Sequence, residues 1–310
     1  MKYSVVIPVF NSEDIVRNTV QRTIQVFEAN NLLFEIVLVN DGSTDDSWSI
    51  LNDLAKKDRR VKAINLLKNY GQHSANLCGF RYASGDFLIT MDDDLQNPPE
   101  EIIHLINKSK EGHDLVIGQF YEKRHALYRR IGSKLVTWMN SKVFGKPKDL
   151  MLSNFRLMNK DVVSRVCDYQ TASPYIPGLV LMMSSAPANV LVEHHDRGKG
   201  QSNYSMIRIL RLIATILFNH SSFPLRMVTV LGLAVSLFSL MLGAAYLVYG
   251  FMAESVVPGW TSLVVLLSFY NGVLMSMVGI LGEYIVRILG QSNGHSPYHV
   301  KVVVDGDKIG

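Results

Sequence analysis

The chain has 310 residues, a net charge of +4, two cysteines and a mean hydropathy of +0.13. This length allows one large domain or two modest ones, two cysteines exclude a disulfide framework, and residues 1–10 are too short and wrongly flanked for a signal peptide. The hydropathy is high for a soluble protein, and the excess is concentrated in two uncharged runs near the C-terminus.

The first 120 residues alternate apolar runs with amphipathic stretches. The apolar runs are too hydrophobic to be half exposed, so they are typical of strands in a mostly parallel sheet covered by helices on both faces. We therefore expect an α/β fold with a doubly wound sheet. The expected strands are residues 3–9, 34–40, 61–67, 86–91 and 114–119, and the expected helices are residues 13–29, 44–57, 71–83 and 99–111.

Capping residues indicate two of the helix starts. Ser43 followed by Asp45 and Asp46 is typical of an N-cap with acidic residues in the first helical turn. Asn97 followed by Pro98 is typical of an N-cap with proline in the first turn. The residues just before Asn97 therefore form a loop between a strand and a helix.

That loop carries three consecutive carboxylates, Asp92, Asp93 and Asp94. Clustered negative charges are unfavourable unless a cation joins them, and oxygen ligands are those that Mg²⁺ and Mn²⁺ prefer. A divalent ion held by one or two carboxylates usually completes its shell with water and substrate phosphates. We expect Asp92 and Asp94 to hold a metal-bridged nucleotide, and a solvated acidic loop is the alternative.

Polar residues also follow the other expected strands. Loops at the carboxyl ends of parallel strands converge on one crevice, where open α/β sheets bind their ligands. Asp41 could accept hydrogen bonds from a base or a ribose there, although taken alone Asp41 to Ser43 is only a turn with an N-cap. The converging loops are residues 8–11, 40–43, 68–73 and 92–94.

Two basic amphipathic stretches follow. Residues 127–144 carry apolar side chains at helical spacing, and residues 206–218 are nearly all apolar apart from Arg208 and Arg211. Such helices either pack on the sheet or lie in the headgroup layer of a membrane. Because the second stretch precedes an uncharged run, we expect it to lie at the membrane interface. For the first stretch, both placements stay open.

The uncharged runs, residues 227–253 and 255–282, are each roughly 40 Å long as helices, enough to cross a hydrocarbon core of about 30 Å. A hairpin buried in a soluble core would need more surrounding protein than this chain supplies. The loop between the runs contains Glu254 and no Lys or Arg, so the positive-inside rule places both termini in the cytoplasm. We expect an α/β domain at residues 1–204, an interfacial helix and linker at 205–226, a transmembrane hairpin at 227–290 and a cytoplasmic tail at 291–310.

Two shorter features remain. Residues 298–304 are typical of a short strand, which pairs either with a neighbouring subunit or within the same chain. His194, His195 and Asp196 invite a metal-site interpretation, but adjacent histidines on a strand point to opposite faces. We therefore expect no metal at this histidine pair.

In combination these motifs resemble a known family. The chain is similar to the family 2 glycosyltransferases with a GT-A fold at residues 4–11, 40–43, 92 with 94, and 155–158. Two C-terminal spans, the second closing on residues 282–285, narrow the resemblance to polyprenyl-phosphate glycosyltransferases, such as dolichol-phosphate mannose synthase, undecaprenyl-phosphate glucosyltransferases and aminoarabinose transferases. Residues 69–75 and 94–101 are most similar to the aminoarabinose branch.

This resemblance implies transfer of one sugar from a nucleotide sugar to a membrane lipid phosphate. It implies a metal–diphosphate held by Asp92 and Asp94, with Arg156 beside the active site and Asp93 available for a minor catalytic role. The residues expected to bind the nucleotide are Pro8, Asn11, Asp41, Ser43, Asn69 and Asp92. The residues expected to bind phosphate or lipid are Arg130, Arg197, Lys199, Ser202 and Arg208.

The chain departs from the family pattern twice. Asn203 stands where relatives commonly have Lys, so the phosphate role of that loop depends on Arg197 and Lys199. Asn154 stands where many bacterial relatives have an Asp proposed as a metal contact or base. The acceptor is a phosphate monoester with a second pKa near ~6, so it is largely anionic at neutral pH. We therefore expect catalysis by positioning and charge stabilisation, with Asp93 or a metal-bound water filling any small role.

We accordingly expect an inverting, metal-dependent hexosyltransferase that uses Mg²⁺ or Mn²⁺ at the cytoplasmic face of the inner membrane. UDP-glucose is the favoured donor, with UDP-linked amino sugars and galactose left open, and undecaprenyl phosphate is the expected acceptor. The product would serve modification of a glycan or lipopolysaccharide. Membrane lipids and further copies of the chain, as in a tetramer, are expected partners, and nucleic acid is not.

Two other functions are compatible with parts of this pattern. A processive polysaccharide synthase would carry a Gln-x-x-Arg-Trp motif, but Trp48, Trp138 and Trp260 each follow a residue other than Arg. A lipid-phosphate scaffold or translocation protein with a dead transferase domain gains weight from Asn154. That alternative also predicts loss of the pair Asp92 and Asp94, which is intact.

Overall fold

The computed structural model describes residues 1–120, 127–171, 173–195, 225–235, 237–238, 241, 259–292 and 296–306. The chain divides into two compact units, one formed by Met1–Ile209 with Ser296–Gly310 and the other by Leu210–His295. The C-terminal segment therefore belongs to the first unit, although the whole second unit precedes it in the sequence. The finer division at residues 204, 226 and 290 stays a prediction.

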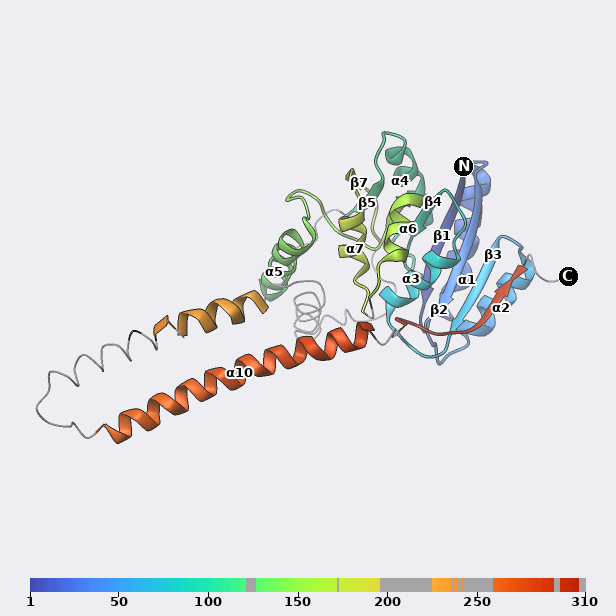
Figure 1. Cartoon of the computed structure of the whole chain (residues 1–310). Coiled ribbons are helices and arrows are strands. Elements are labelled where there is room, and N and C mark those ends of the chain that lie inside the picture. The colour runs from blue at the N-terminus through green and yellow to red at the C-terminus, as the bar shows by residue number, and fades with distance from the viewer. Residues whose placement is uncertain are drawn as a thin grey trace, which may run out of the picture. The chain divides into compact units, whose positions relative to one another are not determined.

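A sheet of eight described strands forms the centre of the first unit, in the order β7-β5-β6-β4-β1-β2-β3-β8 (Figure 1). The four strands β4, β1, β2 and β3 are parallel, and so are β5 and β7. β6 runs antiparallel to β4 and β5, and β8 runs antiparallel to β3. The expected α/β sheet is confirmed, but it is mixed. The strands are β1 (Lys2–Val9), β2 (Leu33–Asn40), β3 (Val61–Leu66), β4 (Phe87–Thr90), β5 (Leu115–Gln119), β6 (Arg156–Asn159), β7 (Pro187–Leu191) and β8 (Val300–Asp305).

Helices cover both faces of this sheet. The helices α1, α2 and α4 share one hydrophobic core with the strands, while α3 and α6 pack against the opposite face. Because both faces are covered, the neighbouring side chains of Val5 and Val6 are both fully buried, although they point to opposite faces. The helices of this unit are α1 (Val16–Ala29), α2 (Ser47–Lys57), α3 (Gln72–Tyr82), α4 (Ile102–Ser109), α5 (Leu127–Phe144), α6 (Lys160–Asp168) and α7 (Ile176–Met183).

Of the two helix starts expected from capping residues, that of α2 was wrong by a few positions, whereas the other lies at Pro99 as expected but without Asn97 as its N-cap. α2 begins at Ser47, whose backbone N–H donates to Asp45 Oδ1 at 3.1 Å, while the Ser43 hydroxyl instead donates to Asn40 Oδ1 at 2.5 Å. The second start is a 3₁₀ turn, η1 (Pro99–Glu101), that leads into α4. The side chain of Asn97 precedes that turn and lies 3.3 Å from a ring nitrogen of His194. Ser43 and Asn97 therefore form hydrogen bonds with Asn40 and His194 and do not cap these helices.

The structure shows how residues 127–144 pack, which the sequence left open. They form α5 as expected, and its second half packs on α7 through the buried side chains of Asn140 and Phe144. The ring of Phe144 lies 5.6 Å from the ring of Tyr175, the residue before α7. On the other side of α5 the indole of Trp138 is 52% exposed. The second expected amphipathic helix, residues 206–218, lies outside the described residues.

The second unit contains a helical segment at residues 225–235 and the helix α10 (Trp260–Ser292), which covers most of the second uncharged run. Much of the first uncharged run lies outside the described residues. In the part of the chain that the structure describes, no helix has both the length and the apolar run needed to cross a membrane.

Close packing of α3 on the sheet places the N-terminus of that helix at the carboxyl ends of β1 and β2. A Cβ atom on Gly79 would collide with the side chain of Val6 and lie 3.3 Å from Val39. We expect Gly79→Ala to lower the free energy of unfolding by about 1–3 kcal/mol, because this core has no room for a methyl group. Thermal unfolding of the purified protein in detergent measures the change. Gly279→Ala in α10 is the control, because no atom of the described residues lies within 4 Å of the added Cβ. Equal melting temperatures for both variants would contradict the expectation.

Candidate active site

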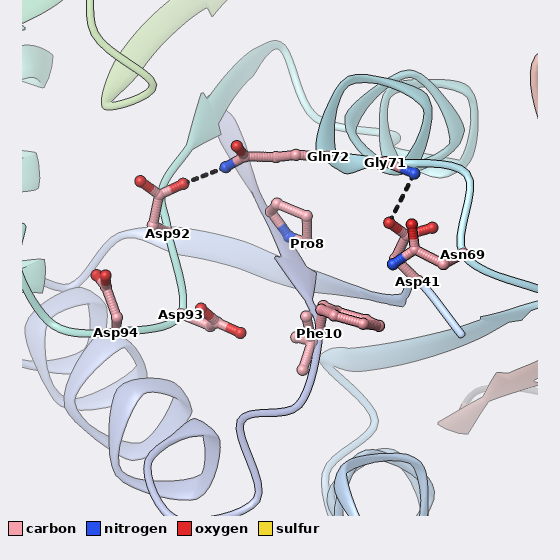
Figure 2. A pocket seen from close by; sticks show the side chains of 10 residues that line it. Pro8, Phe10, Asp41, Asn69, Gly71, Gln72, Asp92, Asp93 and Asp94 are labelled. Atoms are coloured by element: carbon pink, nitrogen blue, oxygen red, sulfur yellow. Dashed lines mark hydrogen bonds between the residues drawn. The ribbon is translucent and has the colours of Figure 1, made fainter. Parts of the chain in front are cut away.

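A cavity of about 290 Å³ lies at the carboxyl ends of β1, β2 and β4 (Figure 2). Loops from four separate strands contribute to its wall, as expected for an open α/β sheet. The lining residues are Pro8, Val9, Phe10, Asp41, Asn69, Gly71, Gln72, Asp92, Asp93 and Asp94. The structure thus brings together six of the residues proposed from the sequence and adds the aromatic ring of Phe10, which is 47% exposed.

Two expected nucleotide contacts, Asn11 and Ser43, are not among the lining residues. The backbone N–H of Asn11 donates to Ser43 Oγ at 3.0 Å, and Asn11 Oδ1 accepts from the backbone N–H of Thr44 at 2.9 Å. Asn11 also has a positive φ of 52°, which asparagine tolerates better than most residues. These two residues therefore join the loops after β1 and β2.

Asp41 is buried against the loop that follows β3. Its Oδ1 accepts from the N–H of Tyr70 at 2.7 Å, and its Oδ2 accepts from the N–H of Gly71 at 2.9 Å. Burial raises the pKa of this carboxyl, and the two backbone hydrogen bonds counteract part of that rise. A carboxylate has about four lone-pair sites, so Asp41 can hold this loop and still accept a hydrogen bond from a ligand.

The acidic triplet divides between two sides of its loop. Figure 2 shows the carboxylates of Asp92 and Asp94 on the same side, with the side chain of Asp93 turned away from them. Asp93 Oδ2 accepts from the hydroxyl of Ser12 at 2.5 Å, and the backbone carbonyl of Asp93 accepts from Thr19 Oγ1 at 2.8 Å. Burial, with the neighbouring negative charges as a smaller cause, raises the pKa of Asp93 to about 7. Asp93 therefore fixes the loop against α1.

Gln72 is a site residue that was not among those proposed from the sequence. It is the first residue of α3, and its Nε2 donates to Asp92 Oδ1 at 2.5 Å (Figure 2). Asp94 is held differently, because its Oδ1 accepts from the backbone N–H of Gln96 at 3.1 Å. The only signal in the sequence was the position of Gln72 in a polar loop after a strand.

The pair Asp92 and Asp94 fits a metal ion that arrives with its substrate. Among the described residues, no group of three His, Cys, Asp or Glu side chains could hold a metal ion. Two carboxylates separated by one residue are a partial set of oxygen ligands, and Mg²⁺ usually takes one or two carboxylates and completes its shell with water and phosphate oxygens. The donor set is therefore right for Mg²⁺ or Mn²⁺ bound together with a diphosphate.

A buried cation lies behind this acidic pair. Arg156 is 1% exposed, and it sits opposite Thr90 in the antiparallel pair β4–β6. Its Nε donates to Thr90 Oγ1 at 3.2 Å, and its Nη2 donates to Asn154 Oδ1 at 2.9 Å. Burial lowers the pKa of Arg156 to about 10, while the nearby charge of Asp92 opposes that change. The guanidinium therefore stays charged at neutral pH.

His73 follows Gln72 on α3 and lies next to this cation. Burial, together with the charge of Arg156, lowers the pKa of His73 to about 4, so its ring is neutral at physiological pH. The ring packs edge-on against Tyr175, with 5.5 Å between ring centroids. Its buried Nδ1 has no hydrogen-bond partner among the described residues.

The other proposed phosphate and lipid contacts are not described. Arg197, Lys199, Ser202 and Arg208 lie outside the described residues, and for Arg130 only the backbone in α5 is described. The histidine pair has structural contacts, since the His194 ring lies 4.4 Å from the Phe120 ring and the His195 N–H donates to the Gln96 carbonyl at 2.9 Å.

Known proteins resemble this chain in sequence and in fold. Two proteins named undecaprenyl-phosphate 4-deoxy-4-formamido-L-arabinose transferase, from Yersinia pestis (strain Pestoides F) and Yersinia pseudotuberculosis serotype O:3 (strain YPIII), are each 33% identical to it over 312 residues, covering 99% of this chain and 95% of theirs. A crystal structure of glucosyl-3-phosphoglycerate synthase from Mycobacterium tuberculosis, in complex with Mn²⁺, uridine diphosphate and phosphoglyceric acid, matches with a TM-score of 0.52 at 17% identity, covering 71% of this chain and 78% of that one. This structural likeness shows the shared fold.

The family model for glycosyl transferase family 2 matches residues 4–180, which is more than half of the chain and includes the cavity, the acidic triplet and Arg156. The sequence relatives extend the match to nearly the whole length. The mixed sheet, with its ligand loops at the carboxyl ends of β1, β2 and β4, is the corresponding GT-A-like architecture. The chain is therefore an enzyme of glycosyltransferase family 2.

Proposed function

We propose that this enzyme transfers one sugar from a nucleotide sugar to a polyprenyl phosphate, with inversion, at the cytoplasmic face of a membrane. The observation that carries the proposal is the pair Asp92 and Asp94 on one wall of the cavity, backed by the buried charge of Arg156. The names of the full-length relatives support undecaprenyl phosphate as the acceptor.

The two walls of the cavity offer different groups, one suited to the nucleoside of the donor and the other to its diphosphate. Phe10 and Pro8 offer an apolar surface for a base, and Asp41 and Asn69 offer hydrogen-bonding groups beside it. On the opposite wall Asp92 and Asp94 would hold the Mg²⁺ or Mn²⁺, which would supply a Lewis acid for the leaving diphosphate. Gln72 keeps Asp92 oriented for that contact.

The reaction forms a bond between an acceptor phosphate oxygen and the anomeric carbon, and it breaks the bond from that carbon to the donor diphosphate. The acceptor is already anionic, so no residue has to remove a proton from it. Asn154 is bonded to Arg156 and cannot act as a base, and Asp93 is turned toward Ser12. We therefore assign Asp93 a positioning role in place of the minor catalytic one expected from the sequence.

UDP-glucose remains the favoured donor, and a UDP-linked amino sugar is the second candidate. The remaining acceptor capacity of Asp41 suits the imide N–H of uracil, which supports UDP. The names of the sequence relatives favour a 4-deoxy-4-formamido-arabinose as the sugar. These two donors differ only in the sugar, so the same cavity residues serve both.

Membrane attachment is supported by the apolar side chains that the second unit exposes. In α10 the side chain of Phe269 is 62% exposed and that of Met275 is 71% exposed, and in the segment at residues 225–235 Leu233 is 68% exposed. Extended apolar surface of this kind is typical of contact with lipid or another protein. We propose that this unit carries the two membrane spans, with membrane lipids as partners and with Arg130, Arg197, Lys199, Ser202 and Arg208 near lipid phosphates. A tetramer also stays a prediction.

The two alternative functions have less support. A processive synthase would carry further membrane helices, whereas this chain matches, over 95% of their length, relatives named undecaprenyl-phosphate 4-deoxy-4-formamido-L-arabinose transferase. A catalytically dead scaffold would have no reason to keep Gln72 bonded to Asp92 beside a buried arginine. We therefore retain the transferase proposal alone.

A donor panel tests the proposed function directly. Membranes containing the enzyme are incubated with radiolabelled UDP-, GDP- and dTDP-sugars, and the label in extracted polyprenyl lipid is counted. We expect transfer from a UDP-sugar, because the remaining acceptor capacity of Asp41 suits the imide N–H of uracil. Transfer from GDP- or dTDP-sugars would contradict the choice of nucleotide, and transfer from none of them would contradict the function.

Loss of the acidic pair should abolish transfer. We expect Asp92→Asn and Asp94→Asn each to reduce kcat by about a hundredfold or more, because the charge that stabilises the leaving group is lost with the metal. Excess EDTA should have the same effect on the wild type, with recovery on adding Mn²⁺. Asp53→Asn is the control, since Asp53 pairs with Arg17 and Lys57 on the surface. Undiminished synthesis by either site variant would refute the metal site.

The absence of a base can be tested at Asn154. We expect Asn154→Asp to change kcat by less than about tenfold, because general-base catalysis, typically worth about a hundredfold or more, is not required by an anionic acceptor. Asn154→Ala removes the acceptor of the Arg156 hydrogen bond and should lower kcat. A rise of about a hundredfold in Asn154→Asp would show that the wild type lacks a base that the reaction needs.

A further inference from the structure

We propose that His299, in the C-terminal segment at residues 296–306, is part of the donor-binding apparatus: it positions the loop at residues 67–71 and thereby sets the affinity for the nucleotide. This inference rests on the proposed function, because it assigns a role within the same site. It concerns a segment that follows the second unit in the sequence yet belongs to the first unit in the structure.

The segment joins the sheet beside the strand that leads into the loop. β8, the red arrow in Figure 1, lies beside β3 and pairs antiparallel with it. Val300 is the partner of Leu66, the last residue of β3. One residue further, the backbone N–H of Leu67 donates to the carbonyl of His299 at 2.9 Å. The pairing therefore continues beyond the end of β3 into the loop itself.

The side chain of His299 contacts the next part of the loop. Its ring lies 6.1 Å from the ring of Tyr70 at an angle of 59°, within the range of favourable ring pairs. The ammonium group of Lys68 lies 5.5 Å from the centre of the same Tyr70 ring. Tyr70 is therefore fixed by two side chains before its backbone N–H reaches Asp41.

The opposite side of the loop is fixed by the turn after β2. Gly42 has a φ of +68°, and a Cβ on it would lie 2.5 Å from the backbone nitrogen of Asn69. The backbone of Asn69, a lining residue of the cavity, is therefore pressed against this turn. The loop lies between Gly42 on one side and His299 on the other, and Asp41 also holds it, so removing the His299 ring releases one of several constraints.

A second contact links the segment to the far end of α3. The buried hydroxyl of Tyr298 accepts from Arg81 Nη1 at 3.2 Å, and the Arg81 guanidinium lies 5.6 Å from the centre of the Tyr298 ring. Arg81 is near the C-terminus of α3, and Gln72 at its N-terminus bonds to Asp92. The segment thus contacts both the loop that precedes α3 and the last turn of α3.

The alternative role for this segment is to cover the edge of the sheet. That role predicts that all contacts of β8 with β3 matter for stability and none matters selectively for the donor. The ion pair of Lys62 with Asp305 at 3.3 Å lies at the other end of β8, away from the loop. A variant at Asp305 is therefore the matched control for one at His299.

The experiment compares His299→Ala with Asp305→Asn in the full-length enzyme. His299 is exposed, so its truncation leaves the core intact. We expect His299→Ala to raise the donor KM by about two- to tenfold, the range for loss of one ring pair, with kcat and the acceptor KM unchanged. Asp305→Asn should leave the donor KM unchanged. Equal donor KM values for wild type and His299→Ala would overturn the inference, as would equal increases in both variants.

Binding measurements separate this inference from the function on which it rests. Calorimetric titration with UDP in the presence of Mn²⁺ should give a Kd that rises in His299→Ala by the same factor as the donor KM. Tyr70→Ala should weaken binding, and adding His299→Ala to it should have little further effect, because the ring pair is already lost. If the wild type binds UDP and His299→Ala binds it with the same Kd, only the role proposed for His299 is refuted. If the wild type neither binds UDP nor transfers a sugar, both this inference and the proposed function are refuted.

Discussion

The structure around the cavity depends on how three adjacent carboxylates share one turn. Asp92 and Asp94 lie on the same side, while Asp93 turns away and accepts from Ser12, and burial there raises the pKa of Asp93 to about 7. Gln72 donates a hydrogen bond to Asp92, and the buried Arg156 places a positive charge near the same carboxylate. The acidic triplet follows the parallel strand β4, Gln72 begins α3, and Arg156 begins β6. These three elements therefore meet beside the cavity.

Local sequence patterns predicted what depends on local sequence. The apolar runs gave β1 to β5 with their intervening helices, because burial on both faces demands continuous hydrophobic residues. They did not predict that β6 enters antiparallel between β4 and β5, since four residues carry no periodicity and the pairing is long-range. Arg156 was therefore identified by family resemblance alone, and the Thr90 contact that fixes it was not foreseen.

The site residues divide in the same way. The loops that carry Asp41, Asn69 and Asp92 were predicted to converge, and all three residues line the cavity, while their binding of a nucleotide stays a prediction. Asn11 and Ser43 occupy the same loops but bond to each other's segments, a choice that depends on backbone conformation and leaves no trace in residue type. The strand at the C-terminus was predicted with two possible partners, and only the three-dimensional register identified β3 of the same chain.

Charge in the cavity explains why the metal and the nucleotide must be considered together. A diphosphate that entered alone would meet the carboxylates of Asp92 and Asp94 before it reached the charge of Arg156, which is almost completely buried. A divalent cation alone would find two carboxylates, one of them already accepting from Gln72 at 2.5 Å. Each therefore lacks ligands that the other supplies, and the proposed function follows from this complementarity, since the pair of carboxylates is sufficient only for a cation that also binds phosphate oxygens.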